Sequence, residues 1–391
     1  MNQKPVVFVA VESSWHGVMR LPKLIAKAGA DMVLMCRAGE VLACSRYTGR
    51  VIKVGGTPEG FCRSVLGHLR KHGEAYAMCI VPDEGLLAEL YGCHDPLVGR
   101  LLPFTQDRAT IEFVRSKLAF MRECSSIGVP VAEFRICQSR EEVALGLKSI
   151  GFPSVVKAVT GSGGSGVRIV RDEAELAKAV GEVGLPLALQ AYVAGRPFST
   201  EVLFERGVPV SWSSSAQLNR WPNTLGSITA KQLIAVPGIE PALIALGRRT
   251  KFHGFACIDA IEPHDGGPVV FCEMGPMQGV EATADKRVLT AFAAAFGRIL
   301  RDEPPLPRSP LPLDRSPIGL FPETFYYLQS HRGELSNWVV ALRSLRHLPY
   351  DDPRLLIRLS ADLLSGILPR LGISTLITEL LSRKSVAVSI T

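Results

Sequence analysis

One segment of the chain combines residue types that bind phosphate. Residues 153–170 join two apolar runs through a loop of glycine and serine, with a lysine in the first run. Glycine lets the backbone approach an anion closely, and a lysine ammonium adds a point charge, so the segment predicts a phosphate-binding hairpin. We expect its loop to be exposed to solvent when no ligand is bound. A flexible turn is the alternative interpretation, and the P-loop pattern does not fit. The expected ligand contacts are Lys157, Ser162, Gly163, Gly164 and Ser165.

A second segment carries two acids on neighbouring apolar runs. Asp259 falls in the run 254–261 and Glu273 in the run 269–276, with a turn sequence between them. This spacing predicts two paired strands, each with one acid near its end. Converging carboxylates suit Mg²⁺, which prefers carboxylate, water and phosphate oxygens. The alternative is that both acids cap solvent-facing strand ends, although apolar neighbours argue against simple solvation.

The first 105 residues show the rhythm of a parallel sheet. Apolar runs near 5–11, 31–35 and 76–81 alternate with helix-like stretches near 16–28 and 58–73. Strands that alternate with helices predict βαβ units, and therefore a Rossmann-like domain over residues 1–105. Side chains after such strands commonly face the ligand crevice, and turn capping is the alternative for them. The candidate substrate contacts of this kind are Ser13, Ser14, Asp83 and Glu84.

Composition narrows the classes of partner. The formal charge of +7 suits anionic ligands, and a basic surface without a specific partner is an equally good interpretation. Clustered Lys and Arg with interleaved aromatic residues are absent, which argues against nucleic acid. The nine cysteines form no C-x-x-C pair and the N-terminus does not read as a signal peptide, so we expect a reduced, cytoplasmic setting.

The C-terminal part is set off by proline. Residues 303–317 are proline-dense and predict a linker, and residues 318–391 predict a helical C-terminal extension. Residues 331–391 are basic and amphipathic in pattern. Packing of this tail onto its own preceding domain or onto a second copy in a homodimer is the preferred interpretation. Contact with a membrane surface is the alternative.

The order of these features resembles the ATP-grasp superfamily. Lys117, the turn 127–131, the Lys157 hairpin, the segment 189–195 and the two acids occur in the order of that superfamily. The resemblance covers roughly residues 106–300. It implies an α/β protein in which a Rossmann-like pre-ATP-grasp domain precedes an α+β ATP-grasp domain over residues 106–302. Within that domain it implies a lid subdomain at about 120–190 and a subdomain built on an antiparallel sheet.

The resemblance also implies roles for single residues. Lys117 and Lys157 would reach the ATP phosphates, while residues 160–166 fold over them as a lid. The adenine ring would lie against Gln190, Tyr192 and Val193, and Asp259 and Glu273 would hold Mg²⁺. The chain departs from the superfamily pattern Glu-x-Asn-Pro-Arg, because glycine and methionine stand where asparagine and arginine are usual. The acid that often contacts ribose would fall at a proline, which leaves Glu201 as its substitute.

A segment between the two sites carries two cations. We interpret residues 218–231 as a loop beside the γ-phosphate and the acceptor, with Arg220 and Lys231 as catalytic residues. A fixed cation there would stabilise the charge that develops during phosphoryl transfer. A surface turn with ordinary charges is the alternative.

The function implied by the resemblance is that of an ATP-dependent carboxylate–amine ligase. With ATP and Mg²⁺ as cofactors, it would activate a small-molecule carboxylate as an acyl phosphate and join it to an amine or a similar nucleophile. The alternative is a non-catalytic nucleotide-binding regulator or scaffold with a degenerate site. The missing asparagine and arginine after Glu273 favour that alternative.

Overall fold

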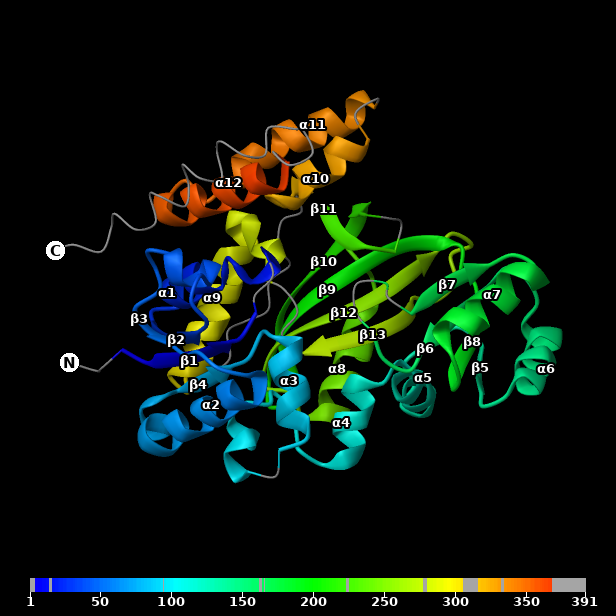
Figure 1. Ribbon diagram of the computed structural model, residues 1–391, viewed down its shortest axis with the longest axis horizontal. Coiled ribbons are helices and arrows are strands. Elements are labelled where there is room, and N and C mark those ends of the chain that lie inside the picture. The colour runs from blue at the N-terminus through cyan, green and yellow to red at the C-terminus, as the bar shows by residue number, and fades with distance from the viewer. Residues whose placement is uncertain are drawn as a thin grey trace.

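The computed structural model describes most of the chain, which contains three sheets and a group of helices at the C-terminal end (Figure 1). The described residues are 4–13, 16–93, 95–161, 164, 166–222, 225–276, 280–304, 316–331 and 334–367. Among them, no helix has the length and apolar content needed to cross a membrane.

The N-terminal region forms a parallel sheet, as the sequence predicted, with four strands in the order β3-β2-β1-β4. The central strand β1 is buried and apolar, whereas the edge strand β3 is half-buried to exposed, and helices and short 3-10 turns connect the strands. The strands are β1 (Val6–Val11), β2 (Asp31–Cys36), β3 (Arg50–Lys53) and β4 (Met78–Ile80). The helices are α1 (Leu21–Lys27), α2 (Pro58–His72) and α3 (Glu84–Tyr91), with 3-10 turns η1 (His16–Val18), η2 (Val41–Cys44), η3 (Gly73–Ala75) and η4 (Pro96–Arg100).

Asp83 acts as a structural cap in this domain. Its Oδ1 accepts a hydrogen bond from the amide of Leu86 at 3.0 Å and so caps α3. Its Oδ2 accepts from the amides of Glu12 and Ser13, at 2.8 and 2.6 Å, and so holds the loop after β1. The capping interpretation is therefore confirmed for Asp83, whereas Ser14 lies outside the described residues.

A smaller antiparallel sheet follows, in the order β5-β8-β6-β7. It has its own apolar core, in which Val143 and Leu176 from two helices pack against Val156 and Leu189 of the strands. The elements are β5 (Phe134–Cys137), α6 (Arg140–Ile150), β6 (Ser154–Ala158), β7 (Val167–Val170), α7 (Glu173–Val183) and β8 (Leu187–Ala191). The predicted hairpin over 153–170 is confirmed as β6 and β7, and Figure 1 shows this sheet projecting to one side.

The largest sheet has six strands in the order β13-β12-β9-β10-β11-β14. Because alternate residues of a strand face opposite ways, β9 packs Val202 and Phe204 with the core around α8 and packs Leu203 with that around α9. The strands are β9 (Gly195–Glu205), β10 (Val208–Trp221), β11 (Ser227–Ile234), β12 (Gly254–Pro263), β13 (Val270–Pro276) and β14 (Ile318–Gly319). The associated helices are α8 (Ile239–Thr250) and α9 (Lys286–Leu300), with the 3-10 turn η5 (Glu281–Ala284).

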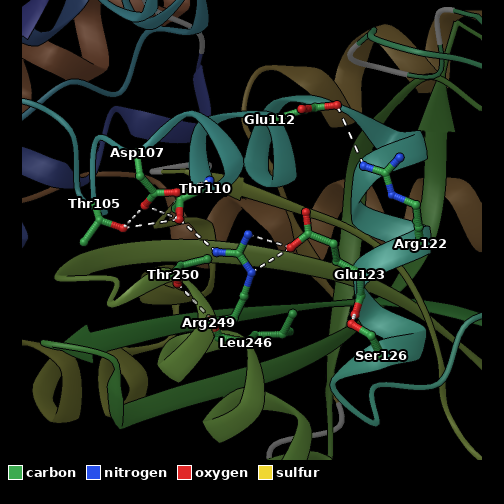
Figure 2. A network of polar contacts seen from close by, with 10 residues as sticks. All are labelled: Thr105, Asp107, Thr110, Glu112, Arg122, Glu123, Ser126, Leu246, Arg249 and Thr250. Atoms are coloured by element: carbon green, nitrogen blue, oxygen red, sulfur yellow. Dashed lines mark hydrogen bonds and ion pairs between the residues drawn. The ribbon is translucent and has the colours of Figure 1, made fainter.

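Two further helices, α4 (Arg108–Arg115) and α5 (Lys117–Ser126), are fixed to α8 by a polar network (Figure 2). Arg249 donates to Glu123 Oε2 at 2.7 Å and to Thr110 Oγ1 at 2.9 Å. Asp107 accepts from the amide of Thr110 at 2.8 Å and caps α4. The network sets the position of α5, and with it the position of Lys117 at the first turn of that helix.

The C-terminal helices are α10 (Glu323–Ser330), α11 (Leu335–Ser344) and α12 (Pro353–Ile367), with the turn η6 (Leu345–His347) before α12. They run along one side of the molecule, with α12 next to the N-terminal domain and α10 and α11 next to the β11 edge of the large sheet (Figure 1). Asp352 bonds the Ser45 hydroxyl and accepts from the amide of Arg46 at 3.0 Å. Asp351 accepts from Lys23 Nζ at 2.9 Å and from the Tyr47 hydroxyl at 2.5 Å. These contacts dock the extension on the N-terminal domain.

Candidate active site

The two predicted acids face each other on the large sheet. β12 and β13 are antiparallel neighbours whose register places Asp259 directly opposite Glu273, so the predicted strand pair is confirmed. Burial and the negative charge of Glu273 raise the pKa of Asp259, although a hydrogen bond from Ser199 Oγ at 2.6 Å acts in the opposite direction. Two adjoining carboxylates with this chemistry fit a divalent cation, which would offset their repulsion. In the described part of the chain, no group of three or more His, Cys, Asp or Glu side chains is arranged as a metal site.

Lys117 joins this pair from the side of α5. Ser116 caps the helix by accepting from the amide of Ala119 at 3.2 Å, which directs the first turn of α5 toward the sheet. The amide of Lys117 donates to the carbonyl of Val159 at 2.9 Å, and its Nζ forms an ion pair with Glu273. One residue thus connects α5, the end of the β6 hairpin and the metal-binding candidate Glu273.

Lys157 lies on β6 and is buried, at 7% exposure. Its charge reaches β13, because the pKa of Cys272 is raised by burial and lowered by Lys157. A buried lysine costs free energy unless an anion accompanies it, and in the described part of the chain no acid forms an ion pair with Lys157. The structure therefore brings Lys157 to the same region as Lys117 and the two acids.

The residues expected to hold adenine lie at the end of the smaller sheet. Gln190 is buried on β8, and its Nε2 lies 3.3 Å from Met121 Sδ. Tyr192 is exposed and Val193 is half-buried, in the short segment that connects β8 to β9. The segment has no regular secondary structure. Adenine binding by these residues stays a prediction.

The hairpin loop is described only in part, because Ser162, Gly163 and Ser165 lie outside the described residues. Gly164 has a φ of +78°, and a Cβ at this position would lie 1.9 Å from the carbonyl oxygen of Leu225. The backbone here packs directly against the turn between β10 and β11. Gly164 is half-buried, whereas Gly161 at the start of the loop is exposed, and glycine is required at position 164 by both the backbone angle and the close approach.

Arg220 is held by neutral groups. Its guanidinium donates to the carbonyl of Gly226 at 2.9 Å and bonds the side-chain oxygen of Gln217. It lies close enough to Asp259 to lower the pKa of that acid, and within the described residues it forms no ion pair with an acid. The sequence interpretation of residues 218–231 as a loop is wrong, because β10 extends to Trp221 and β11 begins at Ser227. Arg220 is consequently fixed on a strand.

Lys231 lies apart from Arg220 in a buried ion cluster. Its Nζ lies 3.0 Å from Glu201 Oε1 and 2.6 Å from Glu281 Oε2, and all three side chains are at most one-tenth exposed. Burial alone would lower the pKa of Lys231, but the charges of Glu281 and Glu201 outweigh it and raise that pKa. Burial raises the pKa of Glu281, and the charge of Lys231 opposes this shift. The cluster keeps a permanent ammonium on the sheet face that carries Asp259.

Glu201 is committed to this cluster. Its carboxylate accepts from Lys231 and from the amide of Ala282, at 2.9 and 3.0 Å to its two oxygens. The ribose contact expected for Glu201 stays a prediction, and the structure gives this residue an ion-pairing role instead. Sequence reasoning missed Glu281 and Ser199, because only the strand register and the turn η5 bring them to the site.

Comparison with known proteins agrees with this geometry. Residues 116–201 match the family described as Carbamoyl-phosphate synthase L chain, ATP binding domain. The biotin carboxylase domain of 2-oxoglutarate carboxylase from Hydrogenobacter thermophilus, solved as a dimer with MgADP, ADP and bicarbonate, aligns with a TM-score of 0.59. Identity is 18%, over 78% of this chain and 72% of that one. The chain shares the fold of this structure, in agreement with the resemblance to the ATP-grasp superfamily seen in the sequence.

Two other similarities show how far this relationship extends. The chain is 35% identical over 79 residues to the carbamoyl phosphate synthase large chain of Thermus thermophilus. This match spans 20% of the present chain and only 8% of the large chain. An L-amino acid ligase from Bacillus licheniformis aligns with a TM-score of 0.54 and 16% identity, over 78% of this chain and 76% of that one. Shared architecture therefore extends well beyond the segment with detectable sequence similarity.

Proposed function

We propose that the protein is an ATP-dependent ligase of the carboxylate–amine type. One observation carries the proposal: Asp259 and Glu273 face each other beside Lys117 and Lys157, at the junction of the two antiparallel sheets. Carboxylates that bind a metal next to lysines that bind phosphate are the groups a Mg·ATP site needs. The ATP-grasp fold and the similarity to an L-amino acid ligase support the reaction class.

In the proposed reaction, an oxygen of the substrate carboxylate attacks the γ-phosphorus of ATP, and ADP leaves. The amine nitrogen then attacks the acyl carbon, the bond to phosphate breaks, and the nitrogen loses a proton. Bound at Asp259 and Glu273, Mg²⁺ would neutralise phosphate charge. Lys117 and Lys157 would bind and orient the phosphates, and Arg220 would stabilise the negative charge that develops on the transferring group.

Arg220 suits this role because neutral groups hold it. A guanidinium that is paired with a carboxylate has its charge largely compensated, whereas carbonyl and amide acceptors orient the group and leave its charge for a ligand. Lys231, by contrast, is compensated by two acids. We therefore assign to Arg220 the stabilisation of the negative charge that develops on the transferring group. We propose that Lys231 has a structural role and holds β11, β9 and the turn η5 together.

The test measures ADP release from Mg·ATP over a panel of carboxylates and amines, alongside calorimetric ATP binding. Glu273→Gln should abolish release, because it removes a negative charge that faces the metal. Glu262→Gln is the matched control, since Glu262 lies on β12 in an ion pair with Arg196 outside the site. Wild-type turnover in Glu273→Gln would refute the metal assignment. ATP binding that is indifferent to Mg²⁺, without ADP release for any substrate pair, would instead support a nucleotide-binding regulator.

A further inference from the structure

Helix α11 has its polarity inverted relative to a helix on the surface of a globular protein. Its inward side buries the small or polar residues Asn337, Ala341 and Ser344. Its outward side carries Leu335 and Leu342, at 79% and 65% exposure. Surface helices normally bury their large apolar residues and expose their polar ones. The inversion indicates that the outward side of α11 contacts something other than the rest of this fold.

The inward side has a structural reason for its small residues. Ser344 packs against Gly319 of β14, where a Cβ would lie 2.3 Å from that of Ser344. Asn337 Nδ2 donates to the carbonyl of His331 at 3.3 Å, which anchors the start of the helix. Close approach to the sheet edge therefore fixes the inward side of α11. It does not explain why the outward side is apolar.

The outward side is a continuous stripe rather than scattered residues. Its aliphatic members are spaced as i, i+4, i+7 and i+10, so they lie along one side of about three turns. They are Leu335, Val339, Leu342 and Leu345. Trp338 lies within the stripe and is 44% exposed. We call these five residues the α11 stripe.

The exposed charges beside the stripe are mostly positive. Arg343 and Arg346 are exposed, and within the described residues they form no ion pairs. Of the acids near the helix, Glu334 is exposed and accepts from Asn337 Nδ2 at 3.3 Å, whereas Asp351 is paired with Lys23 and Asp362 with Arg358. Asp352 is likewise engaged with the N-terminal domain. An apolar stripe flanked by uncompensated arginines is the pattern of a helix that lies on an anionic lipid surface.

We propose that the α11 stripe binds the surface of a bilayer that contains anionic lipid. Two other partners for the stripe are a second copy of the chain and residues 368–391, and the charge of each argues against it. A second copy related by two-fold symmetry would bring the same arginines together. Residues 368–391 carry three basic residues and one acid, so their charge also repels these arginines. Anionic headgroups attract Arg343 and Arg346 while the acyl region receives the aliphatic side chains. The extension would hold the N-terminal domain near the membrane, because Asp351 and Asp352 fix it to that domain.

The test is co-sedimentation of the full chain with vesicles of phosphatidylcholine alone or mixed with phosphatidylglycerol. The wild type should bind the mixed vesicles at least about tenfold more strongly, and high salt should weaken this binding. The double variant Leu335→Ser, Leu342→Ser should lose at least about fivefold. Leu145→Ser is the matched control, because Leu145 is 63% exposed on α6 of the smaller sheet, and it should bind as the wild type does.

Further variants separate charge from apolar contact. Arg343→Gln with Arg346→Gln should reduce binding to mixed vesicles and leave the weak binding to phosphatidylcholine unchanged. Circular dichroism should report the same fold for every variant, since the altered side chains are exposed. Equal binding to both vesicle types, or an equal loss in Leu145→Ser, overturns the proposal. So does light scattering that shows a dimer which the leucine variants convert to a monomer while vesicle binding is absent.

Discussion

Replacing Lys231 by methionine tests whether the buried ion cluster stabilises the fold. Methionine has a similar length and fills the space without leaving a large cavity, so the change removes mainly the charge. Glu201 and Glu281 would then face each other without the ammonium that lies within 3.0 Å of both. Removing one partner of a buried ion pair typically costs about 3–5 kcal/mol, because the remaining charge stays desolvated. Two acids depend on this one cation, so we expect the upper part of that range.

Urea unfolding, followed by circular dichroism at pH 7, measures the effect. With a denaturant dependence of about 3 kcal/mol per molar urea, a loss of about 4–5 kcal/mol should lower the midpoint by about 1.3–1.7 M. Adding Glu281→Gln to the variant should recover about half of the loss, because it removes one of the two uncompensated charges. Glu201 would keep its hydrogen bonds from the amide of Ala282. A loss below about 1 kcal/mol, or no recovery in the double variant, would refute the reasoning.

The same variant should acquire a characteristic pH dependence. Burial and the charge of Glu201 raise the pKa of the Glu281 carboxyl, and without Lys231 nothing in the cluster opposes this shift. A group whose pKa is raised by folding gives its full stabilisation below its unfolded pKa, and this is lost as pH rises through the folded pKa. The stability deficit of Lys231→Met should therefore shrink as pH falls from 7 toward 5. In the wild type, the raised pKa of Lys231 keeps it charged through this range.

Two further predictions concern the phosphate site and the cap of α4. Lys157→Ala should weaken ATP binding in calorimetry by about 2–3 kcal/mol. Lys148→Ala is the control, because Lys148 is exposed, and it should bind ATP as the wild type does. Equal affinities of the wild type and both variants would remove Lys157 from the site. Asp107→Ala should lower the free energy of unfolding by about 1 kcal/mol at pH 7, because it removes the α4 cap. Hydrogen bonds from Thr110 lower the pKa of Asp107 to about 2. The difference in melting temperature between variant and wild type should therefore vanish as pH falls through that value. A difference that persists at lower pH would contradict the capping role of Asp107.

The sequence was most informative where local pattern and structure coincide. The hairpin around Lys157 and the strands that carry Asp259 and Glu273 were predictable, because alternating apolar runs bounded by turn residues leave few other structures. The parallel order of the N-terminal strands followed from their alternation with helices. These features depend on contacts between segments that are close in the sequence.

Features that depend on distant contacts were not predictable in this way. Arg220 reads as a loop residue because asparagine, proline and glycine surround it, yet the neighbouring strand extends the hairpin through it. Gly164 reads as a mobile loop glycine, whereas the carbonyl of Leu225 lies against it. Glu281 gives no local signal at all, and its role depends on Lys231, which is fifty positions earlier. Tertiary contact overrides local pattern at each of these positions.

The contrast between the two lysines at the large sheet bears on how the proposed site would work. Lys231 is paired with two acids in the protein interior, where exchange of partners would leave a buried charge uncompensated. Among the residues that the structure describes, Lys117 is paired only with Glu273, whose side chain is about one-third exposed. Phosphate could therefore replace Glu273 as the partner of Lys117, and Glu273 would then be released to a metal ion that arrives with the nucleotide. Phosphate then neutralises Lys117, and the metal ion neutralises the released Glu273. Nucleotide and metal should therefore bind jointly. This exchange needs only one ligand-facing acid at each strand end, which is why Gly275 in place of asparagine is compatible with the proposed activity.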